Sequence, residues 1–306
     1  MKKERNKLVI AGGTGFVGEA MIKLLTPKFK QVVVLTRRPQ VSTLHVTYVQ
    51  WNGVDGGNWQ KEIEHSDLLI NLCGKSVDCR YTEANKKAIL DSRVQSTLAL
   101  GAACIAAKAP PKVWMNAASA TIYAHEENHP HTELDGRIGS GFSVDVCTAW
   151  EGIFNEIPLN QTRKIILRMA LVLGNAGGVW PKLRSLTKLG LGGQMGNGNQ
   201  MISWIHEKDL TKAILFAYEN EMEGPVNLSA PAPLSNQEFM KMLRQKTGTK
   251  FGLPASNWML ELGAKLIGTE TELILKSRYV MPEKLLQSGF KFEFPSLPSA
   301  MKMLQT

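Results

Sequence analysis

A glycine-rich turn near the N-terminus is the first segment whose residue types suggest a specific chemistry. The run GGTGFVG at 12–18 places Gly12, Gly15 and Gly18 three residues apart. It directly follows an apolar run, 7–11, and it opens the pattern of an amphipathic helix. Glycines at this spacing let the backbone turn tightly and let a pyrophosphate approach the free N–H groups of the helix N-terminus. The turn predicts a dinucleotide-binding site, and the alternative is a turn without a ligand.

Two arginines follow the second predicted strand, 31–36. Arg37 stands 22 positions after Gly15, where an NAD site is expected to have an acidic residue that accepts the ribose hydroxyls. Arg38 comes next, and two guanidinium groups suit a 2′-phosphate through charge-assisted bidentate hydrogen bonds. The pair therefore favours NADP over NAD as the cofactor. The alternative is a pair of solvated arginines at the end of a strand.

The elements that must position these groups alternate between strand-like and helix-like patterns. Several predicted strands are continuous apolar runs, which is typical of strands buried on both faces of a parallel sheet. The predicted strands are 7–11, 31–36, 46–50, 67–72, 112–117 and 164–169. Apolar residues between them advance by four, four, four and three, which predicts one stripe of a helix. This stripe consists of Leu90, Val94, Leu98, Ala102 and Ile105. The alternation predicts an α/β fold with a doubly wound parallel sheet of the Rossmann type.

The chain divides into two parts by its patterns. We expect residues 1–175 to form an NADP-binding Rossmann domain, with the sheet completed by later segments around 200–230. We expect residues 176–306 to form a smaller, mostly helical part that binds substrate. Its predicted helices are 236–247, 257–267 and 282–288.

Composition narrows the class of protein. Lysine and arginine exceed aspartate and glutamate by 36 − 27 = 9, but the basic residues are spread along the chain and no nucleic-acid motif accompanies them. This favours a diffuse solubilising charge with one local anion site over a nucleic-acid interface. No apolar run approaches the ~18 residues of a membrane span, and the N-terminus lacks a signal-peptide pattern. The four cysteines lack the spacing of a zinc site, so we expect no metal and a reduced, cytoplasmic protein.

Further motifs resemble the extended short-chain dehydrogenase/reductases, the superfamily of sugar-nucleotide epimerases and dehydratases. The glycine run, the segment NLCG at 71–74 and the segment NAASATIY at 116–123 carry this resemblance. It is closer still to an atypical subfamily of NAD(P)-dependent epimerases of unknown substrate with a C-terminal helical module. The motifs for this subfamily are Cys147 with Trp150 and Glu151, the loop 192–200, the segment SWIH at 203–206, and the C-terminal residues 282–297. Together these motifs cover essentially the whole chain.

The resemblance implies cofactor contacts at the glycine turn, after the second strand, and where the fourth and fifth strands end. The implied contacts are Gly12, Thr14, Gly15, Phe16, Val17, Thr36, Arg37, Arg38, Cys73, Gly74, Ala117 and Ala118.

The catalytic pair of this superfamily is absent. Its members use Tyr-x-x-x-Lys on the fifth helix, where the lysine lowers the pKa of the tyrosine so that the phenolate can take a proton as hydride moves. Counting back from Glu151, the equivalent positions hold Ser143 and Cys147. A serine hydroxyl is too weak an acid, and an uncharged thiol cannot replace an ammonium group. Cys147 is either a thiol of the site or a small buried hydrophobic residue.

Three residues remain as catalytic candidates. Ser119 matches the catalytic Ser/Thr of the superfamily, which hydrogen-bonds the reacting oxygen; the alternative is a polar strand end. Arg93 stands where extended members carry asparagine and could bind an anionic substrate or a cofactor phosphate. Its alternative is a surface salt bridge with Asp91 or Glu83. Tyr123 could donate a proton, or be an inert core aromatic residue whose hydroxyl contacts water.

These residues predict an NADP(H)-binding, epimerase-like oxidoreductase that acts on a small polar substrate by hydride transfer. The substrate would be a nucleotide sugar or another anionic compound, and neither nucleic acid nor a membrane is expected as a partner. The alternative function is a non-catalytic NADP(H)-binding protein with a redox-responsive regulatory role. The sequence leaves the identity of the substrate and the oligomeric state open.

Overall fold

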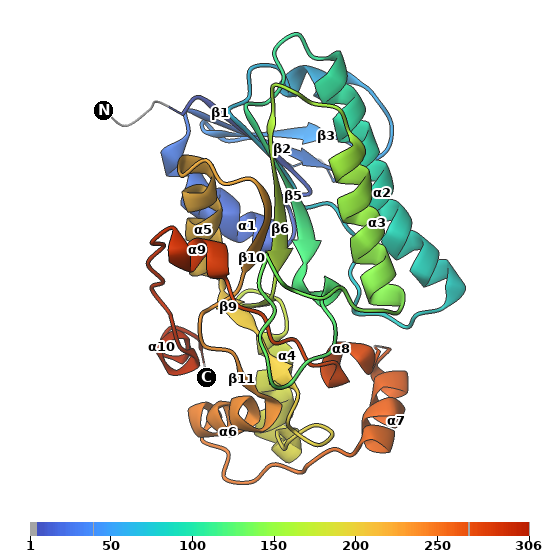
Figure 1. Ribbon diagram of the computed structural model, residues 1–306, viewed down its shortest axis with the longest axis vertical. Coiled ribbons are helices and arrows are strands. Elements are labelled where there is room, and N and C mark those ends of the chain that lie inside the picture. The colour runs from blue at the N-terminus through green and yellow to red at the C-terminus, as the bar shows by residue number, and fades with distance from the viewer. Residues whose placement is uncertain (1–4, 39, 269, 306) are drawn as a thin grey trace.

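A seven-stranded parallel sheet forms the centre of the molecule in the computed structural model, which describes residues 5–38, 40–268 and 270–305 (Figure 1). The strands are β1 (Lys7–Ala11), β2 (Gln31–Thr36), β3 (Val46–Gln50), β4 (Leu68–Asn71), β5 (Val113–Ser119), β6 (Arg163–Met169) and β10 (Gly224–Leu228). Their order is β10-β6-β5-β4-β1-β2-β3. The chain therefore reverses direction across the sheet between β1 and β4, and ligands of such sheets bind at the carboxyl ends of the strands beside this reversal. The predicted Rossmann-type fold is confirmed.

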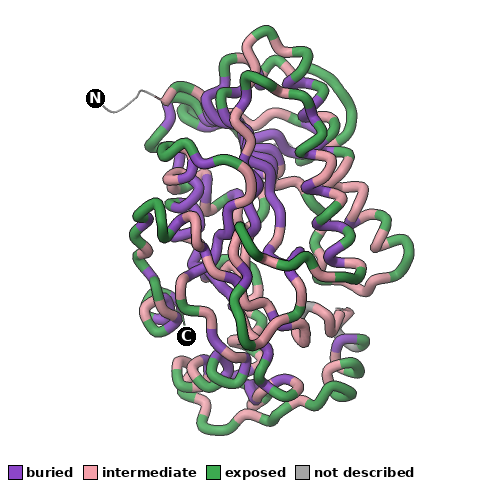
Figure 2. The backbone as a smooth tube through the Cα atoms, in the orientation of Figure 1, coloured by how far each residue is buried: buried purple, intermediate pink, exposed green. Residues whose placement is uncertain are grey.

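The alternation of side chains along β1 divides the core into two layers. Leu8 and Ile10 face one side of the sheet, and Val9 and Ala11 face the other, and all four are fully buried. Helices α1 (Phe16–Leu25) and α5 (Glu207–Glu219) cover the first side, while α2 (Glu83–Ala106) and α3 (Phe142–Glu156) cover the second (Figure 1). The strands are accordingly the most continuously buried segments of the chain (Figure 2).

Helix α2 buries a different face from the predicted one. Leu98 and Ile105 of the expected stripe are 47% and 55% exposed, whereas Leu100 and Cys104 are buried. The reason is the close packing of α2 against the chain at the end of α3. A Cβ on Gly101 would lie only 2.5 Å from the side chain of Ile157, so the small residues of α2 determine its buried face. The presence of this helix was predicted correctly, but the face that it buries was not.

The C-terminal part is mostly helical, and most of its helices lie beyond the carboxyl ends of the strands (Figure 1). Its helices are α4 (Trp180–Leu186), α6 (Asn236–Thr247), α7 (Asn257–Ile267), α8 (Glu272–Leu275), α9 (Glu283–Gln287) and α10 (Leu297–Met301). Helix α6 begins with a capping box between Ser235 and Glu238 and ends at Gly248 in the left-handed conformation, so its sequence signals both ends. Two short pairs of strands, β7 (Leu171–Leu173) with β9 (Trp204–His206) and β8 (Met201–Ile202) with β11 (Leu234–Ser235), connect this part to the sheet.

A membrane span would need a longer and more apolar helix than any found in the described part of the chain.

Candidate functional site

The glycine turn has the geometry that a bound pyrophosphate requires. Gly12 has a φ of +75°, and a Cβ there would lie 3.0 Å from the backbone N of Cys73. A Cβ on Gly18 would lie 2.3 Å from the carbonyl oxygen of Gly13, so this glycine allows α1 to approach the turn. Gly15 differs, because no atom lies within 4 Å of a Cβ built on it, and no side chain caps the helix that begins there. The open space and the uncapped N–H groups fit a dinucleotide.

The residues after β2 lie beside this turn. The hydroxyls of Thr14 and Thr36 are 3.4 Å apart, and Thr36 is buried. The backbone N–H of Arg38 donates to the Thr36 Oγ1 at 3.2 Å, so the chain is fixed as it leaves the sheet. Both Arg37 and Arg38 are exposed, and neither forms an ion pair with a carboxylate of the described residues. Two unpaired guanidinium groups thus follow the strand next to the glycine turn.

The ends of β4 and β5 are connected by buried amides. The Asn71 Nδ2 donates to the Asn116 Oδ1 at 2.8 Å, and the Asn71 Oδ1 accepts from the backbone N–H of Cys73 at 3.0 Å. Burial raises the pKa of Cys73 to about 12, so its thiol is neutral. Ala117 and Ala118 are buried where β5 approaches its end.

Other predicted contacts of the cofactor pack against protein. Val17 packs against the buried core on the side of the sheet that α1 and α5 cover. The Phe16 ring lies against a second glycine turn after β7, where Cβ atoms on Gly177 and Gly178 would lie 2.9 and 3.0 Å from it. The guanidinium of Arg93 packs directly against Gly74, because a Cβ on Gly74 would lie 3.2 Å from the Arg93 Cζ.

The two positions of the missing catalytic pair lie on α3. The Ser143 hydroxyl donates to the Glu272 Oε2 at 2.9 Å, a contact between the sheet domain and α8. Cys147, one turn later, is 5% exposed and packs with Ile122 and Val280. Burial, with the negative charge of Glu151, raises the pKa of Cys147 to about 11. Its thiol is therefore a neutral, buried group.

Tyr81 was missed by the sequence reasoning and reaches the position of Ser143. Its hydroxyl lies 3.4 Å from the Ser143 Oγ. Its ring packs edge-on against Phe142 at 4.8 Å, and its backbone N–H donates to the Glu270 Oε1 at 2.7 Å. Burial, followed by the negative charge of Glu272, raises the pKa of Tyr81, so the phenol keeps its proton at neutral pH. No spacing in the sequence indicates this residue, because it comes from the loop before α2.

The candidates at the end of β5 have different surroundings. The Ser119 hydroxyl donates to the Thr121 Oγ1 at 3.0 Å and accepts from the backbone N–H of Thr121, so it caps the short 3-10 turn Ala120–Ile122. Tyr123 is fully buried. Its hydroxyl donates to the Asn227 Oδ1 and accepts from the Arg168 Nη1, both at 2.9 Å. Tyr123 is thus a core residue, as in the alternative weighed for it, but its hydroxyl contacts Asn227 and Arg168 and not water.

Arg93 is held by the backbone and by an aromatic ring. Its Nη1 donates to the carbonyls of Lys75 and Ile89 at 3.1 and 2.9 Å, and its Cζ lies 5.1 Å from the ring centroid of Trp150. The surface salt bridge weighed for Arg93 is wrong. Asp91 pairs with Lys87 and Glu83 pairs with Lys86 instead.

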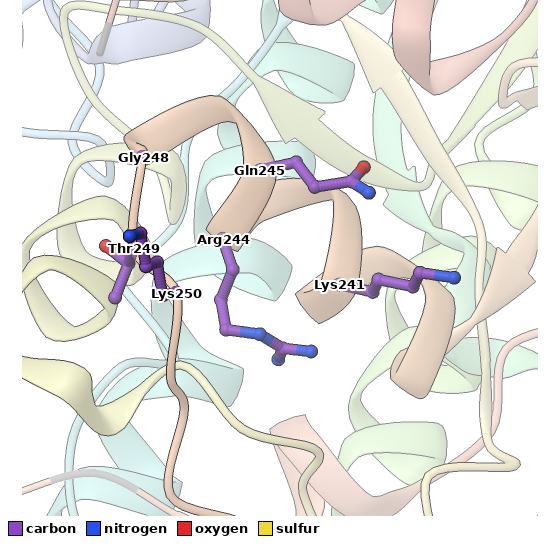
Figure 3. Close-up of a pocket in the computed structure, with 6 residues that line it drawn as sticks. All are labelled: Lys241, Arg244, Gln245, Gly248, Thr249 and Lys250. Atoms are coloured by element: carbon purple, nitrogen blue, oxygen red, sulfur yellow. The ribbon is translucent and has the colours of Figure 1, made fainter.

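Outside this region, the described part of the chain has a basic pocket but no cluster of metal-binding side chains. The described residues contain no group of three or more His, Cys, Asp or Glu side chains that could hold a metal ion. A pocket of about 400 Å³ lies at the C-terminal end of α6 (Figure 3), where its lining includes Lys241, Arg244 and Lys250. Arg244 donates to the carbonyl of Gly192 there. This basic pocket contains none of the predicted site residues.

Comparison with known proteins gives two matching families. Residues 8–229 match the NAD dependent epimerase/dehydratase family, and residues 255–304 match a domain of unknown function, DUF1731. An epimerase family protein of Staphylococcus saprophyticus is 32% identical over 299 residues, which are 97% of this chain and 98% of that protein. The epimerase family protein YfhF of Bacillus subtilis is 31% identical over 299 residues, with 97% of each chain covered.

Solved structures have the same fold. The human epimerase family protein SDR39U1 (isoform 2), solved with NADPH, has a TM-score of 0.85 and 28% identity, covering 97% of this chain and 98% of that one. MoeE5, in complex with UDP-glucuronic acid and NAD, has a TM-score of 0.78 and 17% identity, with 97% of each chain covered. At this lower identity, the second likeness shows the fold alone.

Proposed function

Because the chain belongs to the NAD dependent epimerase/dehydratase family, we propose that it binds NADP(H) and transfers hydride between this cofactor and a small polar substrate. The open space at Gly15, at an uncapped helix N-terminus, is the observation that carries the cofactor site. Arg37 and Arg38 support NADP over NAD, since they are positive and unpaired among the described residues. The human relative solved with NADPH agrees with this choice of cofactor.

We propose the same division of the chain as in the sequence analysis. Residues 1–175 would hold the cofactor, with the sheet completed by later segments, and residues 176–306 would contribute to the substrate site, for example through Glu272 on α8. The four cysteines are free thiols, which supports a reducing, cytoplasmic environment.

We assign the proton transfer to Tyr81. When bound, NADPH supplies the hydride for a carbonyl carbon of the substrate. The Tyr81 hydroxyl gives its proton to the carbonyl oxygen, so a C–H and an O–H bond form as the carbonyl π bond breaks. The resulting phenolate regains a proton from water. The Ser119 hydroxyl rotates its proton from the Thr121 Oγ1 to the reacting oxygen and donates a hydrogen bond to it. Because the pKa of Tyr81 is raised, its proton is present at neutral pH for this step.

The substrate class is a nucleotide sugar or another anionic compound. MoeE5 was solved with UDP-glucuronic acid, and a related epimerase of Methanobrevibacter ruminantium with UDP-N-acetylmuramic acid, so the fold accommodates such substrates. The alternative of a non-catalytic regulator rests on the absence of the Tyr-x-x-x-Lys pair, whose positions hold Ser143 and Cys147.

A screen for turnover tests this function. Purified protein with NADPH would be offered small aldehydes, ketones and oxo acids, and protein with NADP⁺ would be offered UDP-glucose and UDP-glucuronic acid, whose hydroxyl-bearing carbons can only donate hydride. The loss or gain of NADPH absorbance would be followed. We expect oxidation of NADPH with at least one anionic carbonyl compound. Tight NADPH binding with no oxidation by any of them would contradict hydride transfer while leaving the cofactor site intact.

A further inference from the structure

Two arginines from different elements reach the part of α3 where the usual catalytic pair is absent. Arg93 comes from α2, and Arg278 comes from the segment between α8 and α9. Positive charge from both acts on the Cys147 thiol, although burial dominates its pKa. The Arg93 Cζ lies 5.1 Å from the ring centroid of Trp150 on α3. Val280, two residues after Arg278, packs in the buried cluster of Cys147. Both arginines are therefore near the same part of α3, although 185 residues separate them in the chain.

Arg278 is rigidly placed by its backbone. Its N–H donates to the carbonyl of Met201 at 2.8 Å, and its carbonyl accepts from the N–H of Ser203 at 3.0 Å. This pairing holds the segment extended, so that Arg278 and Val280 point to the same side. Val280 is in the buried cluster of Cys147. Arg278 is therefore directed toward α3.

The guanidinium of Arg278 forms no ion pair with a carboxylate of the described residues. Its Nη1 donates to the carbonyl of Ser277 at 3.2 Å, and its buried Nε has no hydrogen-bond partner among the described residues. Burial lowers the pKa of Arg278 to about 10, against the charge of Glu272. Glu272 is the nearby carboxylate, and it already accepts from Ser143 and lies 3.6 Å from the Lys276 Nζ.

Arg168 is another buried arginine near Cys147, and unlike Arg278 it has a carboxylate partner among the described residues. Its charge also acts on the Cys147 thiol, but it is paired with Glu151 through two hydrogen bonds of 2.9 and 2.7 Å. A buried guanidinium normally has such a partner, because an unpaired buried charge is costly. Arg93 has two carbonyls and an aromatic ring but no carboxylate partner among the described residues. Near Cys147, the positive charges of Arg93, Arg278 and Lys276 therefore exceed the negative charge of Glu272.

We propose that Arg278 and Arg93 together bind an oxyanion of the substrate, a carboxylate or a phosphate, beside the Tyr81 hydroxyl. This inference rests on the proposed function and narrows its substrate class. The anionic group lies next to the carbon that exchanges hydride, as in a 2-oxo acid, and not only in a distant diphosphate. An anion in this position completes the hydrogen bonding of the Arg278 Nε. It also fixes the carbonyl relative to Tyr81.

The test measures anion binding without turnover. Oxalate and inorganic phosphate would be titrated separately, by calorimetry, into protein saturated with NADP⁺. We expect at least one of the two to bind the wild type, and the better of them identifies a carboxylate or a phosphate as the group recognised. Arg278→Met and Arg93→Met should each weaken that binding about ten- to a hundredfold, because each removes a charge-assisted hydrogen bond. Arg278→Lys, which keeps the charge, should weaken it less than Arg278→Met.

A control variant separates the two basic regions. Arg244→Met alters the pocket at the end of α6 (Figure 3) and should leave anion binding unchanged. NADPH affinity, measured on every variant, reports an intact fold and cofactor site. If wild type binds NADPH but neither anion, or if Arg244→Met alone loses the anion, the anion site is overturned while the cofactor site stands. If wild type binds no NADPH, the proposed function fails instead.

Discussion

The Tyr81 hydroxyl lies 3.4 Å from the Ser143 Oγ, although 62 residues separate the two in sequence. Ser143 occupies the position at which the resemblance to short-chain dehydrogenase/reductases predicts a tyrosine. A phenol therefore reaches this position from the loop before α2 instead of from α3. Phe142 and Glu270 hold that phenol through its ring and its backbone.

Replacing this phenol should affect turnover and not cofactor binding. In Tyr81→Phe, we expect kcat to fall about a hundredfold or more, because general acid catalysis typically contributes that much. NADPH affinity should stay the same, since Tyr81 is outside the glycine turn. Steady-state kinetics and a fluorescence titration of NADPH measure the two effects. Unchanged kcat in Tyr81→Phe would show that another group donates the proton.

Ser119 and Cys147 should differ sharply in their effects on rate. Loss of the Ser119 hydroxyl in Ser119→Ala removes a hydrogen bond to the reacting oxygen, which costs about 1–3 kcal/mol, or roughly ten- to a hundredfold in kcat. Ser119→Thr keeps both the hydroxyl and the cap of the turn Ala120–Ile122, and it should retain most of the activity. Cys147→Ala should leave kcat within a few-fold, because its thiol is buried and neutral. A large loss in Cys147→Ala, with normal folding and NADPH binding, would place the thiol at the reaction centre.

A side chain at Gly15 should block the cofactor and spare the fold. Gly15 has an ordinary extended backbone with a φ of −91°, and a Cβ there meets no atom within 4 Å. Gly15→Val therefore fits the free protein and occupies the space of the pyrophosphate. We expect loss of NADPH binding with an unchanged melting temperature. Gly152→Ala, which adds a Cβ to open space on α3, is the matched control and should bind NADPH normally.

The sequence predicted most of the fold because its signals are local. Buried runs such as Lys7–Ala11 and the capping signals of α6 depend on neighbouring residues only, and the structure has both at their predicted bounds. The buried face of α2 was predicted wrongly, because it depends on a contact between Gly101 and the distant Ile157. Tyr81 and Arg278 were missed for the same reason. Their relation to α3 exists only after α2 and the C-terminal segment have packed.

His206 should make stability depend on pH. It is 2% exposed, and its Nδ1 accepts the backbone N–H of Lys208 at the start of α5. Burial lowers the pKa of His206 from 6.5 to about 4. The unfolded chain therefore binds a proton at this residue between about pH 6.5 and 4 while the folded chain does not, so the free energy of unfolding falls as pH falls through this window. The loss due to His206 should be roughly 3 kcal/mol.

An asparagine at this position isolates the effect. Asn also accepts a backbone N–H at a helix start, but it does not titrate. We expect His206→Asn to be less stable at neutral pH, because it loses the ring contact with Phe294, yet to lose less stability between pH 6.5 and 4. Urea unfolding at several pH values measures this. An equal loss in both proteins would mean that His206 is not the titrating group.

The preference for one nicotinamide cofactor tests the central claim most directly. Fluorescence titration of the wild type with NADPH and with NADH should give a dissociation constant at least about a hundredfold lower for NADPH, because Arg37 and Arg38 each contribute about 1.5–3 kcal/mol through the 2′-phosphate. Arg37→Ala and Arg38→Ala should weaken NADPH binding and leave NADH binding unchanged. Equal affinities of the wild type for NADPH and NADH would contradict the claim.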